Sequence, residues 1–482
     1  MESKNSIFSL VPSNLDLTRV EQQNQLILSK VMKDKIYVLL DSITQSKLKK
    51  SLHINPYTYL NGKKLKYLYG NCYPFLLKVL INANVIESNN SYTVGKQSKG
   101  YRYTIDYRES LPVLIRITNT TLIKKFTNSN VTINSGYNHL EHFINGLRVD
   151  VQQAEKYIFT LYERKHKKYL IDVDVFFTNQ FNKEVLTQEV PKNPIFWLYH
   201  QLRAIYLLHN KQFRFKVDDS GYRLHTNLTN IKKELRAFVT YNDVELVSVD
   251  YVNSQPLLST ILLNKSFWSK GTSINTINLS NITFDNKEVN LIDNIIININ
   301  SYSYTMIPTF NKDNDSKGIE QYISLCEDGV LYEYLQSNLG LENSSRKDVK
   351  SSVFQILFTD NRFIGQKQAE PKRAFRDLFP EVYKLMSLVK RKDSKFLPLL
   401  LQRIESEILL NRVSKRIEIE QPSLPIFTIH DSLVTTSGNE FYVQSIMLEE
   451  IYKAIGLMPK TTIDYWNSNS LIELTEGNTS VA

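Results

Sequence analysis

The chain has 482 residues, a length that suggests several domains or one large multi-part enzyme. Its hydrophobic fraction of 42%, with 28 Tyr and 23 Phe, excludes global disorder, and its two cysteines have no spacing typical of a disulfide framework or a zinc site. The net charge of +10 favours a polyanionic partner such as nucleic acid.

Residues 1–34 are predicted to form a leader with one amphipathic helix in RVEQQNQLILSKVM. The leader lacks the basic and apolar regions of a secretion signal. No run of the chain approaches the roughly 20 apolar residues of a membrane helix. Together with the scarcity of cysteine, these observations predict a cytoplasmic protein that makes no use of a membrane.

Residues 35–110 predict two helices, in DKIYVLLDSITQSKLKKSL and YPFLLKVLINANVIESNN, followed by a hairpin of SYTVG and GYRYTID. The hairpin combines a basic tip with ring-bearing strands (Lys96, Lys99, Tyr92, Tyr101, Tyr103). This order resembles a winged helix-turn-helix, which can place a helix in the DNA major groove and its wing on phosphates. The same module could instead dock a protein, such as a replication partner, or pack on the rest of the chain.

Residues 111–200 carry two basic helical stretches, YERKHKKYL and WLYHQLRAIYLLHNKQ, suited to contacting a duplex backbone. Between them, LIDVDVF predicts a strand. Its Asp172 and Asp174 could be metal ligands of a nuclease, but no partner motif follows, so the ordinary reading as a strand is favoured.

Within residues 201–482, the stretch at 245–259 predicts a strand that ends in a carboxylate. In ELVSVDYVNSQPLLS, the apolar run up to Val249 predicts the strand, Asp250 sits at its end, and Pro256 marks a break into a helix. A carboxylate that ends a strand is well placed to hold a metal. Further on, residues 271–317 are rich in Asn and Ile and are predicted to be an insertion.

The stretch SSRKDVKSSVFQILFTD predicts a helix whose chemistry lies on one side. Two cations and two rings recur every four residues (Arg346, Lys350, Phe354, Phe358). Cations over a triphosphate beside rings under a base describe a nucleotide-binding helix. By spacing alone, a basic amphipathic helix with phenylalanines in the core is the commoner case.

FTIHDSLVTT places His430 and Asp431 between two apolar runs, as at a hairpin turn. A carboxylate there is costly unless something cationic neutralises it. It is either a satisfied structural group or a metal ligand. Asp250 and Asp431, each at a strand end, could meet across one sheet and hold two divalent ions, for which Mg²⁺ is the expected metal.

Together these stretches resemble, in order, motifs A, B and C of the family A (DNA polymerase I-like) DNA polymerases and of the single-subunit phage-type RNA polymerases. GYRLHTNLTNI, at 221–231, is similar to an element that family A enzymes carry upstream of motif A, and LLQRIESEILL, at 400–410, to their Gln-bearing helix ahead of motif C. The resemblance covers roughly residues 190–470.

The resemblance implies an α+β fold, a right-hand polymerase with an antiparallel palm sheet, helical fingers and a small thumb. The palm and fingers would occupy 201–482, including the Asn-rich insertion, and a thumb-like helical region would occupy 111–200. The winged-helix-like module at 35–110 would be an addition at the N-terminal end.

The resemblance also implies a role for each matching residue. Asp250 and Asp431, with the Tyr251 carbonyl, would bind two Mg²⁺ ions, or Mn²⁺ in their place. On the nucleotide side, Arg346 and Lys350 would bind the triphosphate, with Lys350 donating a proton to pyrophosphate. The other implied contacts are Phe354, Phe358 and Gln255 to the incoming nucleotide, and Arg223, Asn227, Gln402 and His430 to the primer and template.

Three positions depart from the family A pattern: Gln255 replaces the Glu that crowds the sugar 2′ hydroxyl, Phe358 replaces a Tyr, and Ser432 replaces the Glu after His-Asp. The implied function is a template-directed nucleotidyltransferase, a compact DNA polymerase that uses dNTPs on a DNA primer-template and lacks a proofreading exonuclease. An RNA polymerase or primase-like relative, using rNTPs or an RNA template, is one alternative. A non-catalytic nucleic-acid-binding replication or defence protein is the other.

Overall fold

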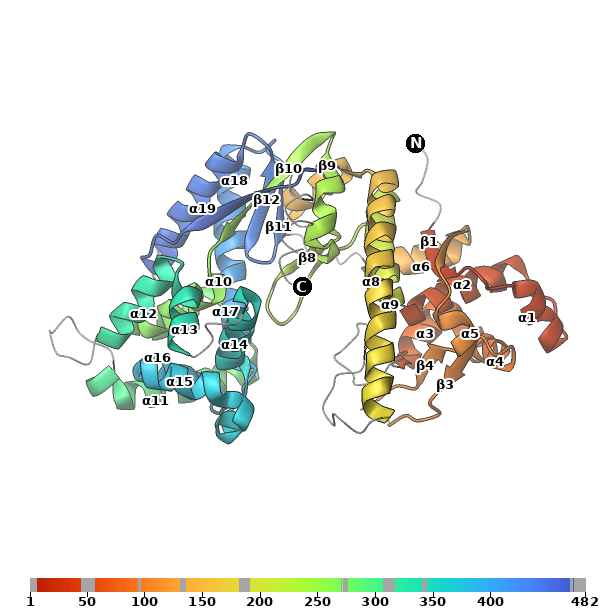
Figure 1. The fold of residues 1–482 in the computed structure, drawn as a ribbon. Coiled ribbons are helices and arrows are strands. Elements are labelled where there is room, and N and C mark those ends of the chain that lie inside the picture. The colour runs from red at the N-terminus through yellow and green to blue at the C-terminus, as the bar shows by residue number, and fades with distance from the viewer. Residues whose placement is uncertain are drawn as a thin grey trace.

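Figure 1 shows the computed structural model of the chain, in which the long helix α8 separates an N-terminal lobe from the C-terminal elements. The structure describes residues 7–44, 57–93, 97–130, 136–181, 191–269, 271, 276–306, 317–339, 345–468 and 471. Helices and antiparallel sheets make a mixed fold, and the main sheet is curled.

The N-terminal lobe has a hydrophobic core of its own, built from residues between Ile7 and Phe126. Within it a helix, a strand, two helices and two strands follow in sequence, and the three strands form a sheet in the order β2-β4-β3. The elements of the lobe are β1 (Ile7–Pro12), α1 (Leu17–Asn24), α2 (Lys30–Thr44), β2 (Thr58–Tyr59), α3 (Gly62–Tyr69), α4 (Tyr73–Asn82), β3 (Ile86–Ser88), β4 (Gly100–Tyr103), α5 (Ile105–Arg108), β5 (Pro112–Ile117) and α6 (Thr120–Asn130).

The structure corrects two expectations for this lobe. The predicted leader helix is two helices, because Gln25 adopts a left-handed conformation with φ 52° and ends α1. The strand β1 precedes both helices. The hairpin exists, but its first strand is Ile86–Ser88, paired with β4, rather than SYTVG. Residues 45–56 and Lys96 at the predicted wing tip lie outside the described residues.

The connecting region is helical, including the stretch predicted as a strand. Asp172 and Asp174 lie exposed on α8 (Val151–Phe181), where helical spacing of buried Ala154 and Ile158 outweighs the strand preference of LIDVDVF. α9 (Ile195–His209) packs along α8 and is largely buried, so it is a core helix rather than the predicted duplex-contacting one. Arg203 of α9 pairs with the buried Asp41 of α2, which ties the two lobes together.

None of the helices within the described ranges, α8 included, is apolar over a length that would span a membrane. Short elements complete the connection between the two lobes. These are α7 (Asn138–Glu141), β6 (Leu147–Val149), β7 (Phe215–Val217) and β8 (Leu224–Thr226).

The main sheet is antiparallel in the order β11-β12-β10-β9-β6, with β13 also paired to β10. The strand at its centre, β10, is buried at every position from Leu246 to Val249, so side chains on both of its faces are covered, and helix α19 packs against it. The strands and helices of this part are β9 (Val239–Tyr241), β10 (Val244–Tyr251), α10 (Ser254–Ser259), α17 (Phe396–Ser406), α18 (Ser414–Glu420), β11 (Ile426–Ile429), β12 (Ser432–Thr436), α19 (Glu440–Ile455) and β13 (Thr461–Tyr465).

A helical subdomain is inserted between α10 and α17 and stands beside the sheet in Figure 1. Much of the Asn-rich stretch forms its first helix, whose Ile292, Ile295 and Ile299 are buried in the main core. The helices are α11 (Asn286–Met306), α12 (Lys317–Glu327), α13 (Leu331–Asn338), α14 (Arg346–Phe358), α15 (Glu370–Leu378) and α16 (Pro380–Val389). Residues 272–275 and 307–316 of the stretch lie outside the described residues.

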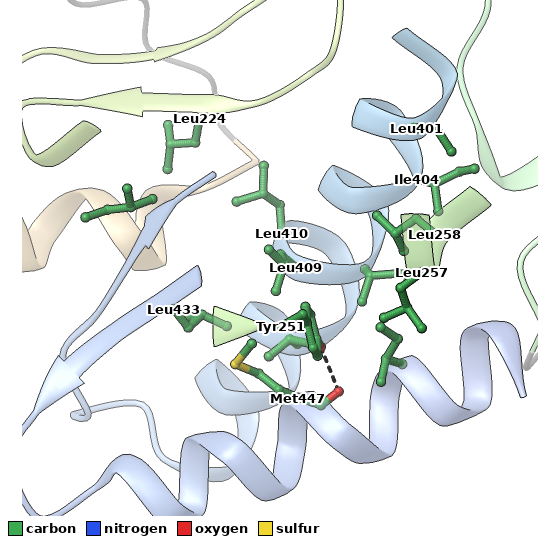
Figure 2. Close-up of a cluster of buried hydrophobic side chains, with 14 of the residues drawn as sticks. Leu224, Tyr251, Leu257, Leu258, Leu401, Ile404, Leu409, Leu410, Leu433 and Met447 are labelled. Atoms are coloured by element: carbon green, nitrogen blue, oxygen red, sulfur yellow. Dashed lines mark hydrogen bonds between the residues drawn. The ribbon is translucent and has the colours of Figure 1, made fainter. Parts of the chain in front are cut away.

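Figure 2 shows the hydrophobic cluster that holds the end of β10 in place. The Tyr251 side chain is buried among leucines of α10, the α17–α18 region and β12, and its hydroxyl donates to the carbonyl oxygen of Met447 at 2.8 Å. Burial of an aromatic ring of this size with its hydroxyl satisfied anchors the strand end firmly. The neighbouring Asp250 is thereby fixed at the edge of the core.

Candidate active site

Asp250 and Asp431 are brought together by the register of the main sheet. β10 and β12 are antiparallel neighbours, and Asp250 lies directly opposite Ser432, the residue after Asp431. β11 and β12 form a hairpin closed by the pair Ile429 and Ser432, which leaves His430 and Asp431 as its two loop residues. The structure thus confirms that the two predicted strand ends meet at one sheet edge.

His430 is held in an unfavourable backbone conformation at this turn. Its φ is +54°, a left-handed value that favours glycine and costs other residues about 1–2 kcal/mol. The side chain is exposed, and partial shielding from water together with Arg223 lowers the pKa of the ring below its usual value. Positive φ at the first loop position of a two-residue hairpin turns this side chain out of the sheet beside Asp431.

The positive charges near Asp250 do not offset its burial and its repulsion by Asp431. Burial and the charge of Asp431 raise the pKa of Asp250 to about 7, although Lys350 and Arg236 oppose the shift. The Oδ1 atom of Asp250 is buried and accepts no hydrogen bond in the described part of the chain. An orphaned carboxylate oxygen facing a second carboxylate is an arrangement that a divalent cation would stabilise.

The donor set fits Mg²⁺ better than a metal enclosed by protein ligands. Across the described residues, no group of three or more His, Cys, Asp or Glu side chains is arranged so that it could hold a metal ion by itself. Mg²⁺ commonly takes one or two protein carboxylates and completes its shell with water and phosphate oxygens. Asp250 and Asp431 satisfy that requirement.

Arg236 is a neighbour of this pair that no sequence pattern indicated. It belongs to a 3-10 turn, Lys233–Phe238, and its guanidinium lies 5.3 Å from the ring of Trp466. Burial lowers the pKa of Arg236, while Asp464, Asp250 and Asp431 favour its charged form. The only sequence signal was the excess of basic residues, which cannot single out one arginine.

The helix predicted for the stretch from Arg346 to Phe358 is confirmed as α14, capped by Ser345 and Asp348. Lys350 is exposed and lies close enough to Asp250 to lower the pKa of that carboxyl. Its Nζ atom lies 5.6 Å from the centre of the Phe354 ring. Phe354 and Phe358 stack with 5.3 Å between ring centres. One side of the helix therefore carries a cation that acts on Asp250 and, along the same side, two stacked rings.

Arg346 begins the same helix and points to solvent. It forms an exposed ion pair with Glu333 at 3.0 Å and lies 5.4 Å from the ring of Tyr332. Exposed pairs of this kind contribute little, about 0–1 kcal/mol, so a phosphate could replace Glu333 at small cost.

Two buried lysines close the far end of α14. Lys372 Nζ donates to the carbonyls of Thr359 and Asp360, and Lys390 Nζ donates to those of Ile356 and Thr359. The last carbonyls of a helix lack partners within it and carry partial negative charge. These lysines supply the missing hydrogen-bond donors, and so fix the C-terminal end of α14, the helix that carries Lys350.

A loop before β8 is docked on α17. Ser406 Oγ donates to the carbonyl of Gly221 at 3.0 Å, and Arg403 Nε donates to that of Ser220 at 2.7 Å. A Cβ atom at Gly221 would lie 2.5 Å from Gln402 Oε1 and 3.1 Å from Gln402 Cβ, so any larger residue would displace the Gln402 side chain. The docking brings the predicted primer-side residues Gln402 and Arg223 to one place.

Arg223 and Gln255 share a buried partner, Glu405, that sequence reasoning missed. Arg223 donates to Glu405 with Nε and Nη2, each at 2.8 Å, and Gln255 Nε2 donates to Glu405 Oε2 at 2.7 Å. Burial raises the pKa of Glu405 to about 7, although Arg223 favours its ionised form.

Asn227 does not belong with these residues. It is buried, its Oδ1 accepts from the backbone N–H of Arg214, and its Nδ2 donates to the carbonyl of Gln212. Both ends of its amide are engaged by backbone, and Asn227 thereby joins the outer ends of β7 and β8. This structural role accounts for the residue without a contact to primer or template.

Comparisons with known proteins add little to this geometry. No protein-family model matches the chain, and no curated protein matches it. Among solved structures, the chain is similar to the POL domain of Pol1 from M. smegmatis in complex with DNA primer-template and dNTP, with 11% identity, 74% of each chain covered and a TM-score of 0.29. At this score the two structures superpose only loosely, and the function proposed below rests on the side chains themselves.

Proposed function

We propose that this chain is a template-directed nucleotidyltransferase, and more specifically a DNA polymerase that extends a DNA primer with dNTPs. The observation that carries the proposal is the meeting of Asp250 and Asp431 at one end of the sheet, near a helix whose Lys350 acts on Asp250 and whose Phe354 and Phe358 stack on each other. Carboxylates for metal, a cation for phosphate and rings for a base are the parts that nucleotidyl transfer requires.

Asp250 and Asp431, with the backbone carbonyl of Tyr251, are the groups that would hold Mg²⁺. Bound there, the metal would activate the attacking 3′ oxygen and stabilise charge on the leaving pyrophosphate. Lys350 offers an ammonium to the same phosphates and can donate a proton to the departing pyrophosphate. Arg346 adds a second cation one helical turn away, once it is released from Glu333.

The remaining residues would orient the substrates. Phe354 and Phe358 stack on each other and provide a flat apolar surface for the incoming base. Arg223 lies close enough to His430 to lower the pKa of its ring, and both residues, with Gln402, would contact the primer terminus or the minor groove. Minor-groove acceptors are similar for every base pair, and contacts to them allow a grip that is independent of sequence.

Two further parts of the chain would hold the duplex. Exposed basic residues of α8 (Arg164, Lys165, Lys167, Lys168) suit contacts with the phosphate backbone of the duplex. The strand and helix order of the N-terminal lobe, with the sheet order β2-β4-β3, supports the proposal that it is a winged-helix-like module that binds DNA or a replication partner.

RNA synthesis is the second candidate, and it rests on the residues at two positions. Ser432 stands where family A DNA polymerases carry Glu, and its hydroxyl donates to the carbonyl of Ile429, which closes the hairpin and leaves no carboxylate there. Gln255 stands where those enzymes carry the Glu that crowds the sugar. Both features favour an rNTP-using or primase-like relative.

The test is extension of a labelled primer on a DNA template with Mg²⁺, in separate reactions with dNTPs and rNTPs. We expect extension with dNTPs, and a loss of at least about 10³-fold in Asp250→Ala and Asp431→Ala, because each removes a metal ligand. DNA binding, followed by fluorescence anisotropy, should remain in both variants.

Asp172→Ala is the matched control, because it removes an exposed carboxylate from α8, a helix that carries neither Asp250 nor Asp431. Extension by rNTPs alone would move the assignment to RNA synthesis. Full extension by Asp250→Ala or Asp431→Ala would refute the site.

A further inference from the structure

Glu405 joins two residues that the proposed function places on different substrates. Arg223 stands on the primer side and Gln255 on the sugar side of the incoming nucleotide, and the carboxylate of Glu405 binds both. Its side chain is 2% exposed, whereas that of Arg223 is 20% exposed. The linking carboxylate is thus the buried member, and Arg223 is the one that reaches solvent.

The position of Glu405 is fixed from several directions. It lies in the last turn of α17, directly before a π-helical segment, Glu407–Val413. Ser406 and Arg403, its neighbours in the chain, hold the loop that carries Arg223. Two parallel hydrogen bonds from a guanidinium to a carboxylate define the relative orientation of both planes. Glu405 therefore has little freedom to move.

This arrangement sets the orientation of the Gln255 amide. An ionised carboxylate accepts hydrogen bonds and cannot donate them, so the amide nitrogen of Gln255 must face Glu405. Gln255 Oε1 then points away from Glu405, and it is buried with no hydrogen-bond partner in the described residues. The amide therefore presents a fixed, unused acceptor.

The network borders the candidate metal-binding carboxylates. The charge of Asp431 contributes to the raised pKa of Glu405, and the charge of Glu405 contributes to that of Asp250. Gln255 lies in α10, which begins three residues after β10 ends. A sugar bound between the triphosphate and the base would reach this corner of the site.

We propose that Glu405 is a positioning residue for sugar selection, which fixes Gln255 and Arg223 in one arrangement so that the site distinguishes ribose from deoxyribose. The proposal rests on the function proposed above. A locked acceptor interacts differently with a sugar that has a 2′ hydroxyl and one that lacks it. An amide free to rotate presents either a donor or an acceptor, and the distinction is lost.

The test compares dNTP and rNTP incorporation at pH 8, where Glu405 is ionised. In Glu405→Gln the amide can no longer accept both hydrogen bonds of Arg223 and that of Gln255. We expect the ratio of kcat/KM for the two sugars, whichever the native chain prefers, to move toward one by at least about tenfold, the effect of losing a hydrogen bond to a charged group.

The double variant Gln255→Glu with Glu405→Gln exchanges the two groups and restores a carboxylate–amide hydrogen bond with reversed polarity. We expect it to recover much of the selectivity that the single variant loses. Asp41→Asn is the matched control, because it breaks another buried arginine–carboxylate pair, between Asp41 of α2 and Arg203 of α9, and it should leave the ratio unchanged.

Thermal unfolding of each variant separates a folding defect from a change in selectivity. Should Glu405→Gln fail to fold, Glu405→Asp keeps the charge but shortens the side chain, and should shift the ratio in the same direction. Two results would overturn the role of Glu405 and leave the proposed function standing. One is a folded Glu405→Gln variant that keeps the native kcat/KM ratio within about twofold, and the other is a double variant no more selective than Glu405→Gln. Absence of nucleotide incorporation by the native chain would overturn the proposed function, and this inference with it.

Discussion

Asp250 lies directly across the sheet from Ser432, so the carboxylates of Asp250 and Asp431 are held at adjacent strand ends. Backbone hydrogen bonds rather than side-chain contacts fix this relationship. Burial of Asp250, together with repulsion from the like charge of Asp431, raises the pKa of Asp250 to about 7. The fold thus maintains a strained pair of charges that a divalent cation would relieve.

We expect Mg²⁺ to stabilise the native chain, since a cation held by the two carboxylates binds only the folded state. At a metal concentration about 100-fold above Kd, the gain in unfolding free energy is about 2.7 kcal/mol. Asp250→Asn and Asp431→Asn should lose this gain, and without metal each should be more stable than the native chain because the repulsion is gone. Differential scanning fluorimetry with and without Mg²⁺ measures both effects.

Asp172→Asn provides the comparison, as an exposed carboxylate on α8. An equal Mg²⁺-dependent rise in Tm for this variant is expected. The same rise in Asp250→Asn would mean that the metal binds elsewhere.

Replacement of Lys350 by Met should reduce nucleotide incorporation by about 10²–10³-fold, because a cation aimed at developing phosphate charge acts mainly in the transition state. Lys347→Met is the matched control: Lys347 is an exposed lysine of the same helix, without the effect that Lys350 has on Asp250. Single-turnover incorporation separates the chemical step from binding. Similar losses in both variants would indicate a general effect of charge rather than a role for Lys350.

The geometry around the two carboxylates and α14 could be predicted from the sequence because local patterns determine it. Apolar runs that end in Asp250 and precede Asp431 mark strand ends, and a four-residue spacing from Arg346 to Phe358 marks one side of a helix. These local patterns agree with the packed structure because the strands and the helix that they predict are themselves amphipathic or buried.

The rest depends on contacts between distant parts of the chain. Glu405 pairs with Arg223 across 182 residues, and no local rule distinguishes it from Glu407 two positions later. Asp172 was assigned to a strand because Ile and Val favour strands, yet packing of α8 against α9 stabilises a helix there. Asn227 matched a motif, but the backbone of its own hairpin takes both ends of its amide.

His430 should show opposite effects on stability and activity. Glycine tolerates a φ of +54°, whereas alanine does not, so His430→Gly should be about 1 kcal/mol more stable than His430→Ala. Both variants should extend primers less well than the native chain, because both lack the ring proposed to contact the primer end. Urea unfolding and primer extension measure the two effects, and equal stability of the variants would contradict the strain at this turn.

Lys390 should make the stability of the chain depend on pH in the alkaline range. Burial lowers the pKa of this lysine from 10.5 to about 7, and it is 3% exposed. Between these two values the unfolded state binds the proton and the folded state releases it, so unfolding free energy rises as pH increases from about 7 to 10. Lys390→Met removes the titrating group, and the native chain should gain stability over this range relative to the variant.

Lys392→Met, which removes an exposed lysine nearby, should follow the native curve. Urea unfolding at intervals of pH from 6 to 10 measures the difference. Parallel curves for the native chain and Lys390→Met would show that Lys390 remains charged in the folded state, held by the carbonyls of Ile356 and Thr359.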